Sequence, residues 1–232
     1  MKLIKLSLLG LLLPVSLAAQ VGHDPARSPY RTLRYGQFIG VNGGWFGGNG
    51  GDLGVAPHGG KVLGLRYDFL GNGTVTIGFA GSVAWLNRII IDPTFPIEHA
   101  VKDTVPNRTA IGEVILQFNL TGGKTWRGFA PYISAGLGAV LAGQTPADSS
   151  GFGFRFQVAV TPGVGTRVFL TERLFLRLEA RSAFWQVKYP PTFRVSPSND
   201  PTKPPVLLSP SKEWLANGWY SIGLSYAFRR PF

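Results

Sequence analysis

The sequence predicts an all-β protein, an eight-stranded antiparallel up-and-down transmembrane β-barrel with short periplasmic turns and long external loops. Eight segments alternate apolar and polar or small side chains, the period of a strand whose two faces meet different surroundings. Each segment approaches or exceeds the roughly 9–11 residues that a tilted strand needs to cross hydrocarbon. The connections between segments are alternately short and long, as in outer-membrane barrels.

The N-terminal residues 1–19 have the three parts of a secretory signal peptide. Lys2 and Lys5 precede an apolar run, and small residues follow it, so we expect cleavage after Ala18 or Ala19 and favour Ala19. Because Pro14 ends an apolar run too short to span a bilayer, a membrane anchor is not favoured.

Residues 20–35 show no periodicity and are predicted to form a periplasmic N-terminal lead-in. Residues 36–232 are predicted to form the barrel. Export by a signal peptide together with a barrel indicates the bacterial cell outer membrane as the location.

The first four predicted strands each have one apolar face. In the third, Val75, Ile77 and Phe79 alternate with Thr76 and Gly78, and the pattern is almost without interruption. The four segments are residues 37–46, 61–70, 74–85 and 109–120.

The last four predicted strands follow the same rule. In the eighth, Ile222 and Leu224 alternate with Ser221, Gly223 and Ser225. The four segments are residues 129–142, 154–169, 173–184 and 219–228.

The short connections are 71–73, 121–128 and 170–173, and the long ones are 47–60, 86–108, 143–153 and 186–218. With both chain ends on the periplasmic side, the strand number is even. A ten-stranded barrel is the open alternative, in which residues 88–92 join a further external hairpin.

The seventh segment indicates which face of the strands is polar, because Leu174, Leu176 and Leu178 alternate with Arg177 and Glu179. In a membrane barrel the leucines contact lipid and the charges point into the lumen. An interior of eight strands has room only for side chains, and an unpaired buried charge is very costly. We therefore predict a plugged lumen filled by a charge network of Arg66, Asp68, Glu113, Arg167, Arg177, Glu179 and Arg181.

Aromatic residues on the apolar faces sort into two belts. Such belts are typical of membrane–water interfaces. The long-loop end carries Trp45, Trp85 and Tyr220, and the short-turn end carries Tyr67, Phe69 and Phe118.

Three stretches carry a resemblance to a known family: "GFAPYISAGLGA", "GVGTRVFLTERLFLRLEARSAF" and the final "YSIGLSYAF". Over residues 36–232 the chain resembles the small eight-stranded outer-membrane barrels of the outer membrane protein A and X type. The resemblance implies that the barrel-assembly machinery recognises the last strand through Leu224, Tyr226, Phe228 and Phe232. Arg230 and Pro231 depart from that pattern.

The composition limits the kinds of partner and cofactor that the chain can bind. The chain has a net charge of +11 and no cysteine, so disulfides and thiolate metal sites are excluded. Because export argues against nucleic acid, we expect outer-membrane lipids and the phosphates of lipopolysaccharide as partners of a monomer. The loop cations available for such contacts, or for plain solvation, are Arg88, Lys102, Arg108, Lys188, Arg194, Lys203 and Lys212.

Catalytic and cofactor sites are not predicted. The stretch "GGNGGDLGV" (47–55) resembles one copy of a calcium-binding repeat, but such sites need tandem copies, so we expect a flexible external loop. His23, His58 and His99 lie outside the strands and lack a nucleophile or metal-ligand spacing. The predicted role is structural or surface-interactive. The alternatives are a narrow porin-like conduit for small solutes and, less favoured, a lipid A-modifying enzyme.

Overall fold

A computed structural model describes residues 28–71 and 73–228 of the chain. The predicted signal peptide, residues 20–27 of the predicted lead-in and the terminal Phe232 lie outside these ranges. The described strands are β1 (Tyr30–Thr32), β2 (Gln37–Phe46), β3 (His58–Leu70), β4 (Val75–Ile91), β5 (Val101–Asn119), β6 (Lys124–Trp126), β7 (Phe129–Ala142), β8 (Phe156–Phe169), β9 (Leu174–Lys188) and β10 (Lys212–Phe228).

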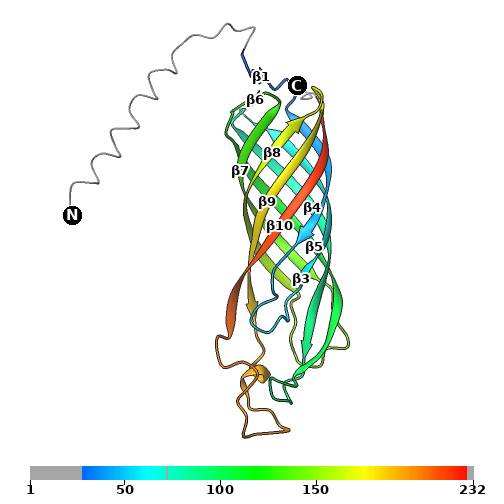
Figure 1. Cartoon of the computed structure of the whole chain (residues 1–232), viewed down its shortest axis with the longest axis vertical. Helices are drawn as coiled ribbons and strands as arrows, with labels where there is room; N and C mark the ends of the chain where they lie inside the picture. Colours follow the sequence, from blue (N-terminus) through cyan, green and yellow to red (C-terminus); the bar gives the residue numbers. More distant parts are fainter. Residues whose placement is uncertain (1–27, 72, 229–232) are drawn as a thin grey trace, which may run out of the picture.

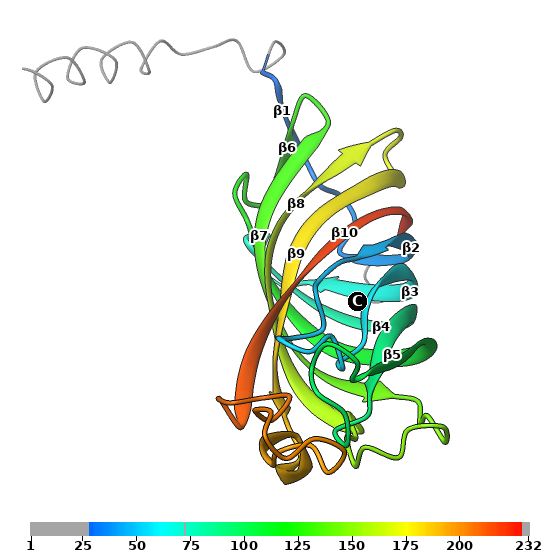
Figure 2. The same ribbon diagram turned by 60° about the horizontal axis from the view of Figure 1, so that its bottom comes forward.

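The eight long strands close into an antiparallel barrel, and this confirms the predicted fold. Each long strand pairs with the long strands before and after it, and β10 returns to pair with β2. Figure 1 shows an elongated barrel with its short turns at the upper end, and Figure 2 shows the long loops at the opposite end.

The ten-stranded alternative is wrong for the described residues. Residues 88–91 are the end of β4, and they pair with β5 from Val105 to Val101. The physical reason is that the hairpin of β4 and β5 continues past the length needed to cross a bilayer. Its outer part therefore extends two existing strands instead of adding two new ones.

The register fixes the tilt of the strands. Following the paired residues from Val41 through β3, β4 and β5 leads to Ala139 of β7. Following them the other way, through β10, β9 and β8, leads to Phe129 of β7, ten residues earlier. A shift of ten residues around eight strands requires strongly tilted strands and a narrow interior.

The lead-in contains structure that the sequence pattern did not indicate. Residues 30–32 form β1, which pairs with β6 from the turn between β5 and β7. Thr32 lies opposite Lys124 and Tyr30 opposite Trp126. A three-residue strand is too short to show a period, so its only signal is the long-range pairing.

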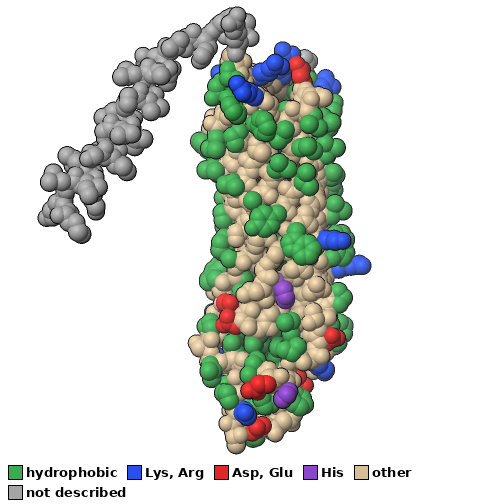
Figure 3. Space-filling view, viewed as in Figure 1, with side chains coloured by type: hydrophobic (Ala, Val, Ile, Leu, Met, Phe, Trp, Pro, Cys, Tyr) green, Lys and Arg blue, Asp and Glu red, His purple; other side chains and the backbone are tan. Residues whose placement is uncertain are grey.

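The outer wall is apolar and the inner wall is polar or small, as the alternation predicts. Leu65 and Leu137 are 63% and 62% exposed, whereas their sequence neighbours Arg66 and Gly136 are buried. Figure 3 shows hydrophobic side chains over the middle of the visible wall and Lys and Arg side chains at its upper end. Among the described residues, no helix is long and apolar enough to cross a membrane.

The glycine-rich stretch 47–57 packs into the barrel mouth, which corrects the prediction of a flexible external loop over residues 47–55. Val55 and Ala56 are fully buried there, and the backbone N–H of Ile89 donates to the carbonyl of Gly54. Gly51 has a φ of 89°, in the left-handed region that favours glycine. The loop folds inward because burying its apolar pair outweighs leaving it in water.

The pairing of β8 with β9 ends before either strand does. It runs from Phe169 opposite Phe175 to Val160 opposite Phe184, with a gap at Pro162, which has no N–H to donate. Beyond this point residues 156–159 of β8 pair with β7 only, and residues 185–188 of β9 pair with β10 only. The barrel wall therefore has a notch at the long-loop end, between β8 and β9.

Candidate functional site in the barrel interior

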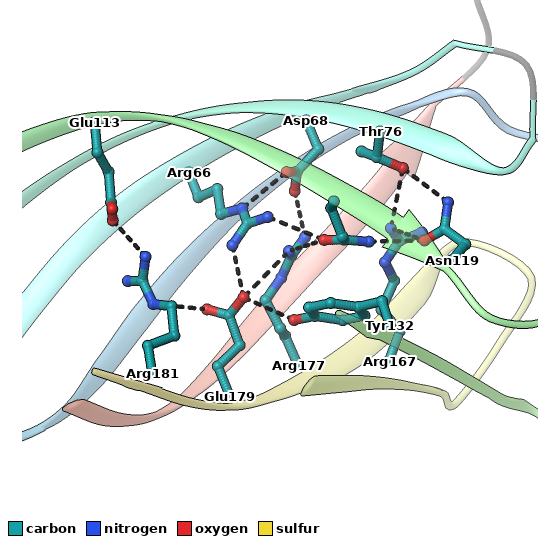
Figure 4. Close-up of polar contacts among 11 residues, drawn as sticks. Arg66, Asp68, Thr76, Glu113, Asn119, Tyr132, Arg167, Arg177, Glu179 and Arg181 are labelled. Carbon is teal, nitrogen blue, oxygen red and sulfur yellow. Dashed lines mark hydrogen bonds and ion pairs between the residues drawn. The ribbon is translucent and has the colours of Figure 1, made fainter. Parts of the chain in front are cut away.

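The structure brings all seven predicted interior charges into one buried layer. β3 supplies Arg66 and Asp68, β5 supplies Glu113, β8 supplies Arg167, and β9 supplies Arg177, Glu179 and Arg181. Each of these side chains points inward because it has the parity opposite to the lipid-facing residues of its strand. All seven are buried, and Figure 4 shows them converging from facing walls.

Asp68 and Arg66 stand at the centre of this layer. The Nε of Arg66 lies 2.8 Å from Oδ1 of Asp68, and its Nη1 lies 2.6 Å from Oε1 of Glu179. Asp68 also pairs with Arg177 through its second oxygen. In the barrel wall β2 and β10 lie between β3 and β9, so the pairs Arg66–Glu179 and Asp68–Arg177 join strands that are not neighbours across the lumen.

A second group of contacts lies closer to the long-loop end. The Nη1 of Arg181 is 2.6 Å from Oε1 of Glu113, and the hydroxyl of Thr161 donates to Oε2 of Glu113 at 2.7 Å. The guanidinium of Arg181 stacks on the Trp219 ring, with 4.0 Å between its carbon and the ring centroid. Its Nε lies 4.0 Å from Glu179, so the two groups are continuous.

Arg167 differs from the other three arginines. Within the described residues it has no carboxylate at ion-pair distance, and its Nη2 donates instead to Asn119 at 3.0 Å and Thr76 at 3.3 Å. Its guanidinium carbon lies 4.9 Å from the Phe38 ring centroid and 5.6 Å from that of Tyr132. The layer thus holds four arginines and three acids, and its net formal charge is +1.

Several neutral side chains complete the layer but were not among the predicted site residues. Gln117 accepts from Arg66 at 3.0 Å, and the Tyr132 hydroxyl donates to Glu179 at 2.7 Å. Asn119, Thr76 and Thr161 also take part. Each lies on the inward parity of its strand, so the alternation contains the signal that identifies them.

Much of the interior outside the charge layer is apolar, so the predicted charge network fills only part of the lumen. On the long-loop side of the charge layer, residues of the strands and loops form one core that includes Phe46, Phe154, Trp185, Phe193 and Trp219. Phe46 and Trp185 stack with ring centroids 5.5 Å apart. The reason is that the long loops fold over the mouth, so inward side chains at this level meet protein instead of water.

A smaller apolar cluster closes the short-turn end. It consists of Phe38, Leu70, Phe175 and Ala227, with Tyr35 and Phe169 packed against it. The interior is therefore stacked in three layers: apolar, charged and apolar.

At the long-loop end, beyond the larger apolar core, Glu213 joins two long loops in a contact that we call the clasp. The hydroxyl of Tyr189 donates to Glu213 at 2.5 Å, and the same carboxylate accepts the backbone N–H of Asp52 at 3.1 Å. Burial, followed by the hydrogen bond to Glu213, raises the pKa of Tyr189 above its usual value. The clasp thus holds the stretch 47–57 against the base of β10 while the phenol is neutral.

The predicted belt residues all point toward the outside of the barrel. Five are exposed, and Tyr67 is half-buried because its hydroxyl donates to Gln37 at 3.0 Å. The side chains of the proposed assembly signal, Leu224 and Tyr226, also face outward, and Phe228 ends β10.

One predicted loop cation is not at the surface. Arg88 is buried, pairs with Asp148 and stacks on Phe152 at 5.0 Å. It therefore fastens the loop between β7 and β8 to β4 and does not contact solvent. The partner lies 60 residues away, so the local sequence gives no sign of the pairing.

The two described histidines lie apart from the charge layer. The Nδ1 of His58 is 2.8 Å from the carbonyl oxygen of Ala56, and His99 is exposed in the loop between β4 and β5. Among the described residues, no group of three or more His, Cys, Asp or Glu side chains is placed to hold a metal ion.

Strand number, register and apolar outer wall together define the class: the chain is a small eight-stranded antiparallel β-barrel of the outer-membrane type. Comparison with protein-family models finds no match, and comparison with curated proteins finds none either.

The solved structures to which the chain is similar include the following three small outer-membrane barrels. The outer membrane protein OprG from Pseudomonas aeruginosa is 15% identical with a TM-score of 0.49, over 86% of this chain and 99% of that one. The N-terminal β-barrel domain of Pseudomonas aeruginosa OprF is 12% identical, with a TM-score of 0.46 and coverage of 85% and 100%. Neisserial surface protein A is 12% identical, with a TM-score of 0.44 and coverage of 87% and 98%. At these identities the likeness concerns the fold alone.

Proposed function

We propose that the chain is an outer-membrane barrel with a closed interior and a structural or surface-interaction role. The observation that carries this proposal is the three-layer filling of the interior. The charged layer joins strands across the lumen through ion pairs of 2.6 Å, and fully buried rings such as Trp185 and Trp219 lie on its long-loop side. A solute crossing the barrel would have to break both.

The apolar outer wall supports the membrane placement. A closed barrel satisfies its backbone hydrogen bonds between strands, which hydrocarbon requires. In this placement the short turns face the periplasm and the long loops face the cell exterior. Outer-membrane lipids and lipopolysaccharide are the proposed partners of a monomer, and the last strand is proposed to engage the barrel-assembly machinery.

Conductance across a planar bilayer tests the closed interior. We expect the full chain to give no stable, reproducible channels, while a general porin reconstituted in the same way gives them. Stable channels of uniform size from the wild-type protein would show that it is a narrow conduit and would overturn the proposal.

We also propose no catalytic role. The contact of His58 with a backbone carbonyl and the exposure of His99 support this. Incubation of purified protein with lipopolysaccharide is expected to release no fatty acid. Deacylation that is lost in the variants H58A or H99A would establish an enzyme instead.

A further inference from the structure

Four side chains from four neighbouring strands form one continuous row on the outside of the barrel. Trp45 of β2 lies opposite Lys61 of β3, and Lys61 lies opposite Trp85 of β4. Trp85 in turn lies opposite Arg108 of β5. The row therefore alternates ring, cation, ring and cation, and Tyr220 of β10 extends it next to Trp45.

This row lies on the lipid-facing side of the wall. Trp45 and Trp85 are 53% and 46% exposed, and Lys61 and Arg108 are exposed as well. One step toward the barrel middle, the lipid-facing residues include Leu63 of β3 and Val83 of β4, which are aliphatic. Along β3 and β4 the aliphatic outward residues therefore end at this row on the long-loop side, and because the strands are tilted the row runs obliquely to the barrel axis.

The two cations of the row are not neutralised by the protein. Among the described residues, neither Lys61 nor Arg108 has a carboxylate within ion-pair distance, whereas Arg34, another exposed cation, has Glu172 at 3.7 Å. Adjacent strands are about 4.8 Å apart, so the two cations lie roughly 10 Å from one another along the row. An anionic group at the membrane boundary would meet both charges without displacing a protein partner.

We infer that this Trp45–Lys61–Trp85–Arg108 row binds the phosphate groups of a phosphorylated glycolipid in the outer leaflet. The inference rests on the proposed membrane placement, with the long loops outside. Lys61 and Arg108 donate charge-assisted hydrogen bonds to phosphate oxygens. The indole rings lie at headgroup level, where amphipathic rings are favoured, and flank the sugar and the first acyl carbons.

The test measures lipid retained by the full-length protein after refolding into phosphatidylcholine vesicles that contain diphosphoryl lipid A or its dephosphorylated form. Protein is captured in mild detergent, and bound lipid is counted by mass spectrometry. We expect at least about tenfold more of the phosphorylated form on the wild type. In the double variant K61Q/R108Q this excess is lost, because each substitution removes a charge-assisted hydrogen bond.

Two further variants separate charge from fold. K203Q makes the same change in an external loop and is expected to keep the wild-type excess. K61R/R108K keeps both charges and is expected to retain most of it. Heat-modifiable migration on a gel confirms that every variant is folded.

Equal retention of the two lipids would show a general interfacial belt, and an excess that K61Q/R108Q leaves intact would place the phosphate site elsewhere. Full displacement of lipid A by millimolar inorganic phosphate would show a free-phosphate site. Each result would overturn the inference while leaving the closed barrel in place. A protein that does not enter the vesicles at all would overturn the proposed function itself.

Discussion

Neutralising Asp68 is the sharpest test of the charge layer. The D68N substitution keeps the shape of the side chain but removes the carboxylate that pairs with both Arg66 and Arg177. The net formal charge of the layer then rises from +1 to +2 within a fully buried environment. Breaking a buried pair by removing one partner costs about 3–5 kcal/mol, since it leaves an uncompensated charge.

For D68N we expect the free energy of unfolding to fall by about 3 kcal/mol, near the lower end of that range. Arg66 keeps Glu179 at 2.6 Å, and Arg177 keeps weaker contacts with Glu179 at 4.0 Å and Gln117 at 3.5 Å. The assay is equilibrium urea unfolding in lipid vesicles, followed by tryptophan fluorescence and by migration of unheated samples on a gel.

Two controls sharpen the result. E172Q removes a carboxylate whose side chain is 67% exposed and pairs with Arg34, and it is expected to cost at most about 1 kcal/mol. The double variant D68N/R177M restores the net charge of +1 and is expected to recover part of the loss. If D68N costs no more than E172Q, the charge layer is not a source of stability and the reasoning is wrong.

Three other outcomes follow from the same structure. W185A is expected to destabilise the protein by about 3–5 kcal/mol, because a fully buried ring leaves a cavity. A loss below about 1 kcal/mol would show that the apolar core at the long-loop end is loosely packed. The raised pKa of Tyr189 means that the folded state favours the neutral phenol. The clasp on Glu213 should therefore hold below the usual tyrosine pKa and weaken as the pH rises from there through the raised pKa. The Y189F substitution should weaken the clasp at every pH. Amide exchange of the loop 47–57 measures this, and exchange that is insensitive to both changes would contradict the clasp. Residues 156–159 should exchange faster than 163–169, because only the latter pair on both sides; equal protection would show that the notch between β8 and β9 is closed.

The strands were predictable because a period of two is a local property. The segments 37–46 and 129–142 match β2 and β7 residue for residue. The inward placement of Arg177 and Glu179 follows from the same parity, and so do the contacts of Gln117 and Tyr132, which the sequence pattern contained but did not single out.

The outer ends of the barrel were not predictable from the same pattern. Residues 101–108 of β5 contain several polar side chains and lack the apolar face of a membrane strand, yet they pair with β4 because the hairpin continues beyond the apolar band. The inward fold of residues 47–57 and the pairing of Arg88 with Asp148 depend on contacts between distant segments. No local period records such contacts.

The central claim is that lipid contacts the aliphatic side of every strand and that the opposite side is enclosed. Ser134 and Ala135 are neighbours on β7 that face inward and outward, and the chain has no cysteine of its own. In vesicles, a lipid-soluble maleimide should label A135C, whereas S134C should react only after urea unfolding. Labelling of folded S134C by a water-soluble maleimide, with A135C protected from both reagents, would contradict the account.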